Sequence, residues 1–261
     1  MNTGTSTLPK INHRLNQIHM KNTLIIGVCL LMSFSASAQW GKKIRGNGKM
    51  VTEERNVGSY DEISVSGWFD VELISGEEGR LTLHGEENLL EYLITEVKNG
   101  KLEIKTRKGY NLQSSSWKSG GIRVSVPVED VRAVSMSGSG DVRGKTKLVS
   151  DYMEVVMSGS GDMELEIESD EMDVTLSGSG DMGLEGSCGK LQVRVSGSGD
   201  VNAYGLSARE VEAVVSGSAD IEVTATEFIK ARVSGSGDIH YRGNPEKIDS
   251  KTSGSGSIQK G

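Results

Sequence analysis

Ser158-Gly159-Ser160-Gly161-Asp162 is one copy of a five-residue motif that recurs through the second half of the chain. The copy that begins at Ser216 has alanine at its fourth position, and the last copy ends in serine instead of aspartate. A repeat of about 20 residues is typical of a solenoid, whose coils bury their apolar faces only against neighbouring coils. The other copies begin at Ser137, Ser177, Ser196, Ser216, Ser234 and Ser253.

Apolar residues occupy alternate positions on both sides of the motif. Alternation with a period of two is the pattern of a β-strand that turns one face toward a core. The sequence therefore predicts an all-β, single-domain parallel β-helix or β-solenoid with coils of about 20 residues. The residues directly before the motif are Met136, Met157, Leu176, Val195, Val215, Val233 and Thr252. Those directly after it are Val142, Met163, Met182, Val201, Ile221, Ile239 and Ile258.

The same alternation continues through the motif itself. If the preceding apolar residue points inward, both glycines point inward, and the two serines and the aspartate point outward. Glycine on an inner face allows a sharp bend or a close backbone approach. We therefore expect the motif to form a corner of the coil. The last coil has Ser250 and Thr252 at core positions and Ser257 in place of aspartate, which is the pattern of a polar cap.

Residues 39–130 show a weaker form of the pattern, and residues 131–261 a regular one. Ser66-Gly67-Trp68-Phe69-Asp70 matches the motif at its first, second and fifth positions, so we interpret it as a diverged eighth copy. Asn99-Gly100 predicts a hairpin turn. Residues 88–97 fit either a short helix or a strand that caps the stack, and residues 108–121 form a polar loop that contains Trp117.

Residues 1–38 are predicted to be an N-terminal extension followed by a secretory signal peptide. Lys21 precedes an apolar run over residues 24–32, and Ala36-Ser37-Ala38 supplies a small-residue cleavage site. Such a segment is too short to remain as a membrane span. Translation from Met20, which directly precedes Lys21, is preferred to a start at Met1. A lipid anchor at Cys29 is the less favoured alternative, because bulky residues precede that cysteine.

Charge and cysteine content narrow the range of functions. The leader holds three of the 29 basic residues and none of the 36 acidic ones, so the mature chain has a net charge of about −10. Nucleic acids and anionic membrane surfaces require a basic face and are therefore not expected partners. Cys188 is the only cysteine outside the leader, which excludes an intramolecular disulfide, and it fits an inert position at a coil junction.

Stacking in register places one motif aspartate of each coil in a single column. Unit charges at the coil spacing of about 4.8 Å repel one another, so the column needs a compensating interaction. Hydrogen bonds from turn amides and stacked serines are the favoured explanation. Cations between the coils, most plausibly Ca²⁺, are an alternative, although one carboxylate per coil is few ligands for calcium. The column consists of Asp141, Asp162, Asp181, Asp200, Asp220 and Asp238.

This column of serines and aspartates is also a candidate binding ribbon for a repetitive ligand such as a glycan. Trp68 and Trp117 are candidate aromatic platforms, or plugs for an end of the core. Catalysis is the alternative, because two carboxylates can hydrolyse a glycosidic bond. Repetition in nearly every coil argues against an active site, and singletons are the better catalytic candidates. These are His84, His240, Tyr241 and Arg242.

Several stretches together resemble the putative auto-transporter adhesin, head GIN domain family. They are Gly46-Asn47-Gly48, residues 51–55 and 63–71, Glu87-Asn88-Leu89-Leu90 and the motif array, in that order. The resemblance covers residues 40–261 and implies an exported β-solenoid with an adhesin-like role. It supplies no catalytic residues and no cofactor. The chain ends at Gly261 without the C-terminal membrane barrel expected of an autotransporter, which leaves surface attachment open.

We therefore expect an exported adhesin-like binding or scaffolding solenoid that recognises a glycan or a cell-surface partner and is not an enzyme. The alternative is a carbohydrate-active β-helix enzyme, a polysaccharide lyase or hydrolase. A third possibility is a structural envelope protein that self-associates through its solenoid ends, where strand edges are unpaired. The expected location is periplasmic, outer-membrane-associated or extracellular.

Overall fold

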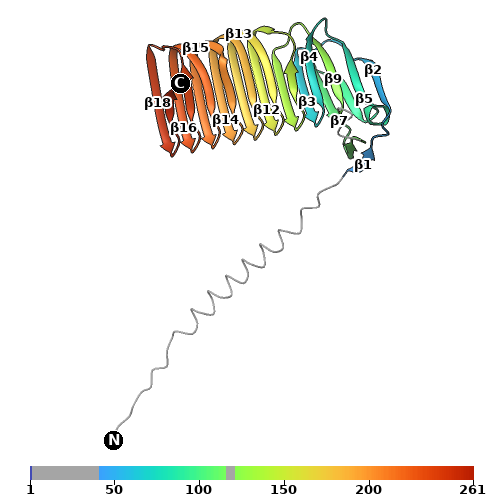
Figure 1. Ribbon diagram of the computed structural model, residues 1–261, viewed down its shortest axis with the longest axis horizontal. Helices are drawn as coiled ribbons and strands as arrows, with labels where there is room; N and C mark the ends of the chain where they lie inside the picture. The colour runs from blue at the N-terminus through green and yellow to red at the C-terminus, as the bar shows by residue number, and fades with distance from the viewer. Residues whose placement is uncertain (2–40, 116–120) are drawn as a thin grey trace. The chain divides into compact units, whose positions relative to one another are not determined.

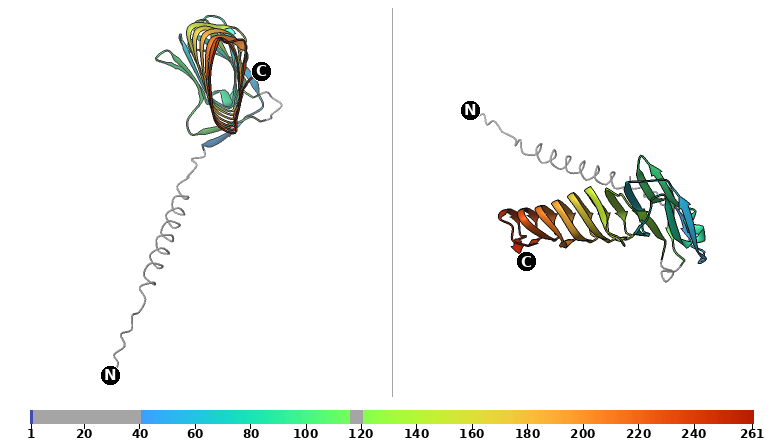
Figure 2. Two further views of the ribbon diagram at one scale, coloured as in Figure 1. Left: turned by 90° about the vertical axis from the view of Figure 1, so that its left-hand side faces the viewer. Right: turned by 90° about the horizontal axis from the view of Figure 1, so that it is seen from above.

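The computed structural model describes Met1, residues 41–115 and residues 121–261. Within this part, one 17-stranded sheet winds into a β-solenoid of about seven turns, and a separate two-stranded sheet lies beside it. Seen along the stack, each coil is a closed, flattened ring (Figure 2). The predicted fold class is confirmed. The predicted signal peptide, Met20, Cys29 and Trp117 lie outside the described residues. No described helix is long and apolar enough to cross a membrane.

The regular coils pair in parallel and in register, as the repeat predicted (Figure 1). Gly178 of one coil pairs with Gly159 of the coil before it and with Gly197 of the coil after it. From β12 to β16, each strand forms both flat faces of a coil and bends between them, whereas the shorter β10 and β11 lie on one face each. The strands are β10 (Ala133–Gly138), β11 (Val142–Gly144), β12 (Leu148–Gly159), β13 (Met163–Gly178), β14 (Met182–Gly197), β15 (Val201–Gly217) and β16 (Ile221–Gly235).

Two corners define each coil. At the motif corner, strands end at the first glycine of the motif and resume directly after its aspartate. At the opposite corner the strand continues, but the pairing skips one residue in each of several successive coils. The core lies between the two faces, where the alternating apolar side chains such as Val155, Val174 and Val193 are fully buried. Burying such a side chain contributes about 1.5–3 kcal/mol, so the ladders of apolar residues are the main source of stability.

The first coils do not follow one another in chain order. β3 (Glu62–Gly67) and β4 (Asp70–Ser75) form a coil that pairs with β10 and β11 on one side. On the other side this coil pairs with β7 (Lys101–Thr106) and β9 (Arg123–Val128), which come later than β3 and β4 in the sequence. Ser66 and Gly67 align with Ser137 and Gly138, which confirms that this stretch is an eighth copy of the motif.

Antiparallel strands close the end of the stack that contains β9. β6 (Leu93–Lys98) and β7 form the predicted hairpin, with positive φ at Asn99 and Gly100. The segment that fitted either a helix or a strand contains both, since the short helix α2 (Glu87–Leu90) precedes β6. β2 (Met50–Asn56) pairs with β5 (Arg80–Glu86), and β5 also pairs with β9. The expected polar loop contains β8 (Tyr110–Gln113), which pairs with β1 (Lys42–Arg45) in the two-stranded sheet.

The other end of the stack is polar, as expected of a cap. β17 (Ile239–Arg242), β18 (Lys247–Gly254) and β19 (Ile258–Lys260) form the last turn. Every residue of β18 is exposed, including Ile248, of which 50% is accessible to solvent. Lys247, Asp249 and Lys251 place charges on this strand, and charged side chains discourage an edge strand from pairing with another chain.

Candidate binding surfaces

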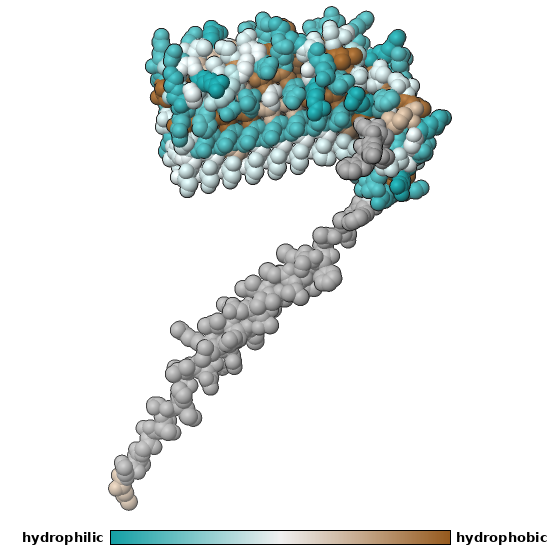
Figure 3. All heavy atoms as spheres, in the orientation of Figure 1, coloured by the Kyte–Doolittle hydropathy of each residue, from teal (hydrophilic) through white to brown (hydrophobic). Residues whose placement is uncertain are grey.

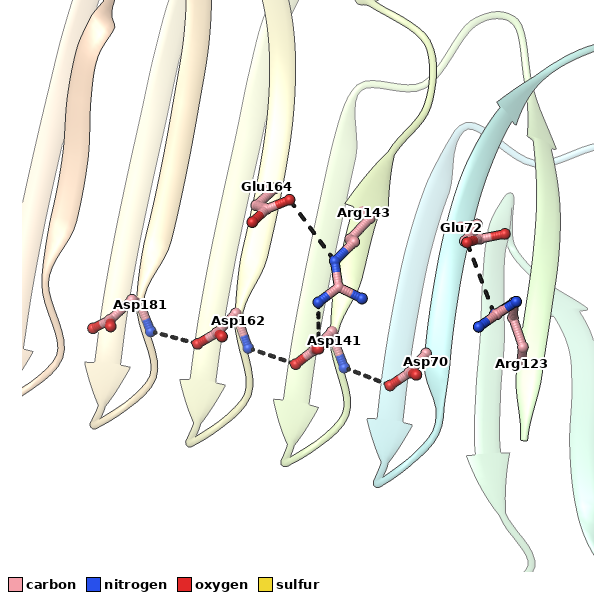
Figure 4. A network of polar contacts seen from close by, with 8 residues as sticks. All are labelled: Asp70, Glu72, Arg123, Asp141, Arg143, Asp162, Glu164 and Asp181. Atoms are coloured by element: carbon pink, nitrogen blue, oxygen red, sulfur yellow. Dashed lines mark hydrogen bonds and ion pairs between the residues drawn. The ribbon is translucent and has the colours of Figure 1, made fainter. Parts of the chain in front are cut away.

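The motif aspartates form a continuous hydrogen-bonded ladder along the solenoid (Figure 4). The backbone N–H of Asp162 donates to the Asp141 carboxylate at 3.0 Å, and that of Asp181 donates to Asp162 at 3.3 Å. The ladder begins at Asp70, which accepts from Asp141 at 3.3 Å. Each carboxylate thus serves as the acceptor for a backbone donor at the corner. Corresponding bonds join Asp181 to Asp200, Asp200 to Asp220, and Asp220 to Asp238.

Backbone carbonyls of the motif satisfy its other donors. The carbonyl of Gly159 accepts from the N–H groups of both Ser179 and Gly180 in the next coil, at 2.9 and 3.3 Å. The first glycine adopts a positive φ, 151° at Gly178, which an L side chain rarely adopts. The second glycine is less strictly required, because Ala219 occupies that position in one coil and is fully buried.

The last copy shows why the aspartate recurs. No coil of the described part stacks beyond Ser257, so its side chain accepts no backbone donor of a further coil there. Its N–H and its hydroxyl both donate to the Asp238 carboxylate, at 2.6 and 2.8 Å. These hydrogen bonds lower the pKa of Asp238. The expected role of turn amides is therefore confirmed, whereas Ser257 is the one motif serine in the described part whose hydroxyl bonds to the column.

The motif corner is also a long, regular surface. It appears in Figure 3 as a pale row of small residues beside a row of hydrophilic ones. Arg143 approaches Asp141 at 2.8 Å and Glu164 at 3.8 Å, so part of the negative charge is balanced near one end of the row (Figure 4). Within the described residues no group of three or more His, Cys, Asp or Glu side chains could hold a metal ion. The row therefore remains a candidate ribbon of hydroxyls and carboxylates without a recognisable cation site.

Trp68, the third residue of the diverged copy of the motif, is partly buried and packs against the core. The neighbouring Phe69 is almost completely buried and occupies the place of the second glycine. Gly121 lies against Trp68: a Cβ added to this glycine would be in van der Waals contact with the indole, at 3.5 Å. The geometry thus fits a plug at the end of the regular corner. Trp117, the other aromatic candidate, lies outside the described residues.

The four singletons do not form one site. His84 lies on β5 and contacts Thr52 at 3.0 Å. His240 lies on β17, paired in register with Glu222 and Gln259. Arg242 stacks over the ring of Tyr204, with its guanidinium carbon 3.8 Å from the ring centroid. Tyr241 is partly buried against the core. His84 is thus on a different end of the stack from the other three.

The sequence did not indicate a groove of about 910 Å³ along the opposite corner. Its lining comes mainly from five successive coils, with Asp61 added from the coil of β3. The residue skipped by the strand pairing is Asp151, Asp170, Gly189 or Arg209 in four of them, and Asp130 occupies the corresponding place in the coil before. Arg209 extends across the backbone of Gly189, since its Nη2 lies 2.9 Å from the position of a Cβ there. We call this hollow the corner groove.

Many polar groups of the corner groove have no partner within the described part of the protein. No hydrogen bond or ion pair there involves the carboxylates of Asp130, Asp151 and Asp170, or the guanidinium of Arg209. Other charged groups of the lining are paired, including Arg132 with Asp61 at 2.7 Å and Glu168 with Lys147 at 2.7 Å. The contrast with the motif corner is direct, because every aspartate of the motif accepts a backbone hydrogen bond.

Exposed apolar side chains also gather at this corner. The large apolar residues exposed in the described part are Met1, Val149, Tyr152 and Ile248. Met1 is the chain terminus and Ile248 lies in the terminal coil, whereas Val149 and Tyr152 flank Ser150 and Asp151 in one turn. They are 54% and 40% accessible. The Tyr152 hydroxyl donates to Asp173 at 2.9 Å, which holds its ring in place. This carboxylate raises the pKa of Tyr152 to about 12.

Cys188 lies on the floor of the corner groove, in register with Ser169. It is nearly buried, and burial raises its pKa to about 11. Because the thiolate is the nucleophilic form, this cysteine is a poor nucleophile near neutral pH. The expected position of Cys188 at a coil junction is confirmed.

A buried carboxylate holds the N-terminal segment to the solenoid. Glu86 is 1% exposed and accepts hydrogen bonds from the N–H of Gly48 at 2.6 Å and of Ser115 at 2.7 Å, and from the Ser114 hydroxyl at 2.6 Å. Burial acts to raise its pKa, but the combined hydrogen bonds lower it to about 2. The Gly46-Asn47-Gly48 loop is thus shaped around this group, since a Cβ on Gly46 would lie 2.1 Å from its carboxylate.

The model of the family "Putative auto-transporter adhesin, head GIN domain" matches residues 59–245. Among solved structures, a putative adhesin from Bacteroides fragilis is 25% identical with a TM-score of 0.75. The match covers 83% of this chain and 99% of the chain of that adhesin. A putative lipid binding protein from Parabacteroides distasonis is 29% identical with a TM-score of 0.71, covering 84% and 100%. A putative adhesin from Parabacteroides merdae, 20% identical with a TM-score of 0.67 and covering 85% and 100%, shares the fold. No curated protein matches the sequence.

Proposed function

The chain belongs to the putative auto-transporter adhesin, head GIN domain family, and from this membership we propose that it is an exported, adhesin-like binding module without catalytic activity. Its partner is a glycan or another component of a cell surface. The family and the Bacteroides fragilis relative, both named for adhesion, support this role. The acidic mature chain favours such partners over nucleic acid.

The observation that carries the proposal is the corner groove. Its size falls within the range of about 300–1,000 Å³ that is usual for ligand sites. The hydrogen-bonded coils on either side keep its walls rigid, so a ligand would bind without ordering a loop. Its carboxylates and its guanidinium need no rearrangement before they contact a partner. The motif row is the second candidate surface, since its serines also face outward.

The name of the Parabacteroides distasonis relative raises a lipid as another ligand class. The space between the two faces of the coils is filled by buried side chains such as Leu165, Ile167 and Leu184. The corner groove is lined mainly by polar residues. An acyl chain gains little in a polar groove, because its binding depends on the burial of apolar area. We therefore place lipid as an alternative outcome of the binding test.

Export is part of the proposal, with a periplasmic, outer-membrane-associated or extracellular location. It is supported by the leader-like sequence of residues 1–38 and by the description of the family as auto-transporter adhesins. Mass spectrometry of the protein from its native cells should give a mature N-terminus at Gln39. A mature chain that retains residues 24–32 would contradict this part of the proposal.

The test uses the mature chain, residues 39–261, labelled at an introduced tag. Binding to intact cells, to purified envelope polysaccharides and to phosphatidylcholine vesicles is measured beside release of shortened polymer. We expect saturable binding to cells or polysaccharide, weakened by Asp151→Asn with Asp170→Asn and unchanged by Ser179→Ala on the motif row. Release of shortened polymer would replace the proposal by a lyase or hydrolase, and failure to bind any surface would overturn it.

The proposed function also includes a scaffolding role, in which copies of the protein associate through the ends of the solenoid. The outer edge of β18 is available for pairing, although Lys247, Asp249 and Lys251 oppose it. Size-exclusion chromatography with light scattering distinguishes the two forms. A concentration-dependent oligomer that is lost on substitution within β18 would support scaffolding, and a monomer at all concentrations would support the binding module alone.

A further inference from the structure

We propose that the corner groove binds a neutral, hydroxyl-rich glycan chain that lies along the solenoid axis. This inference rests on the proposed binding function and assigns its ligand class and site. Three observations carry it: the balance of unpaired charges in the groove, the exposed ring of Tyr152, which directly follows the groove residue Asp151 in the chain, and the regular spacing of the polar groups.

The charge balance selects against anionic ligands. The unpaired charged groups are three carboxylates, those of Asp130, Asp151 and Asp170, against the guanidinium of Arg209. The acidic part of the groove would repel a sulfated or uronic-acid polymer at distances within the Debye length of about 8 Å at physiological ionic strength. Sugar hydroxyls, in contrast, can donate to these carboxylates. Hydrogen bonds to charged acceptors are stronger than those between neutral groups.

Tyr152 supplies the apolar contact that a sugar ring requires. Sugars present a face of C–H groups as well as hydroxyls, and an exposed aromatic ring covers that face. The hydrogen bond from Tyr152 to Asp173 fixes the ring, so little conformational freedom would be lost on binding. Asp151, which lines the groove, directly precedes Tyr152 in the sequence and supplies the nearest groove carboxylate along the chain. An aromatic face next to a carboxylate suits a ligand that is both apolar and hydroxylated.

The spacing of the groove suits a polymer. Coils of a β-solenoid lie about 4.8 Å apart, which is close to the length of one extended monosaccharide unit. The five coils that line the groove therefore span about 19 Å along the axis. Ser187 and Ser207 add hydroxyls in the coils without an acidic residue at the skipped position, and Arg209 provides donors at that end. A chain of several sugars would meet at least one polar group in every coil.

The experiment begins with an array of neutral and acidic glycans probed with the mature chain. Calorimetric titration with neutral oligosaccharides of two to eight units then gives affinity against length. We expect binding to neutral glycans, a gain in affinity up to about five units, and little dependence on salt. Asp151→Asn with Asp170→Asn, and separately Tyr152→Ala, should each weaken binding about tenfold or more.

Two matched variants identify the cause of any loss. Tyr152→Phe keeps the ring and removes the hydroxyl, so it should bind within about threefold of the wild type if stacking is the contribution. Ser179→Ala on the motif row should bind as the wild type does. Circular dichroism and melting confirm that each variant is folded before its affinity is interpreted.

The outcomes separate the two proposals. Binding to cells or to acidic glycans without binding to neutral ones overturns the ligand class and leaves the binding module standing. Neutral glycan binding that survives all groove substitutions overturns the site. Absence of binding to any surface, glycan or vesicle overturns the proposed function together with this inference.

Discussion

The Asp181 carboxylate accepts a hydrogen bond from the backbone N–H of Asp200, 3.0 Å away in the next coil. The same relation recurs from Asp70 to Ser257. A sharp corner interrupts the regular pairing of backbone groups, and each hydrogen bond that restores a partner there contributes about 0.5–1.5 kcal/mol net. The repeated aspartate is thus explained as the acceptor that allows parallel coils to turn tightly.

We predict that Asp181→Ala lowers the free energy of unfolding by about 0.5–1.5 kcal/mol, because the N–H of Asp200 loses its acceptor and is left to water. Asp181→Asn should change it by less than about 0.5 kcal/mol, since the amide oxygen still accepts and repulsion within the column falls. Urea melts followed by circular dichroism measure both. Ser179→Ala is the control, because its hydroxyl has no partner in the described part. Equal effects of the Ala and Asn variants would contradict the ladder.

The two glycines of a motif should differ in their tolerance of a methyl group. Gly178→Ala forces an alanine to φ near 151° and places its Cβ 2.1 Å from the carbonyl oxygen of Gly159. We expect a loss of more than about 2 kcal/mol. A Cβ on Gly180 would lie 1.9 Å from the carbonyl oxygen of Gly161, but Gly180 has no positive φ and Ala219 fills the same position in another coil, so Gly180→Ala should cost less. Thermal melting compares the two, with Ala219→Gly as the reverse substitution. A larger loss for Gly180→Ala would show that close approach outweighs backbone strain.

Glu86 should make stability depend on acid. Its pKa is lowered from 4.5 to about 2 in the folded chain. A lowered pKa means that the stabilisation is complete above the unfolded value and is lost as the pH falls from about 4.5 to 2. At 1.36 kcal/mol per pH unit the full effect is about 3 kcal/mol.

Urea melts at pH 7, 4 and 2.5 test this dependence. Glu86→Gln should be less stable at pH 7, because its amide N–H₂ replaces one carboxylate oxygen and then faces a donor that this oxygen had accepted from, and it should show a smaller loss of stability toward low pH. Glu87→Gln is the matched control, since Glu87 forms only an exposed ion pair with Lys49 at 2.7 Å. Identical pH profiles for Glu86→Gln and the wild type would rule out this role for Glu86.

The stack should be held together by its inner coils and not by its last one. Ile229 and Ile248 occupy equivalent positions in paired strands, but Ile229 is fully buried and Ile248 is 50% exposed. Ile229→Ala should cost about 2–4 kcal/mol and Ile248→Ala less than about 1 kcal/mol. Chemical denaturation gives both values. A similar cost at the two positions would mean that the last coil is covered in solution, for example by a second copy of the chain.

The repeat was sufficient to predict the regular coils, because each coil contacts only its neighbours and the period sets their register. The motif corner, the inward glycines and the diverged copy at Ser66–Asp70 all follow from that local rule. The pairing of β7 with β3 and of β9 with β4 could not be predicted from the repeat, because the period does not extend over these segments. Glu86 likewise pairs with groups 28 to 38 residues away, so its role depends on tertiary contacts.

The corner groove left only a weak signal in the sequence. Ser150, Ser169 and Cys188 each stand eight residues before a motif. In the other copies the residue at this position is Glu129, Ala208, Thr226 or Pro245. Because the residues at this corner differ from coil to coil, the sequence did not indicate a site there. The motif is uniform, and the candidate binding ribbon was therefore assigned to it. The two corners differ physically in whether their carboxylates already accept hydrogen bonds from the fold. The motif aspartates are engaged in the fold, and those of the corner groove are free to engage a partner.

Hydrogen exchange at the backbone amide of Asp200 tests the role of the motif most directly. NMR of the folded mature chain would follow this amide in the wild type and in Asp181→Ala. The ladder predicts that the amide is protected in the wild type, like that of Val201 in the adjoining strand, and exchanges much faster in the variant while Val193 in the core remains protected. Equal exchange of the Asp200 amide in the two proteins would contradict the ladder.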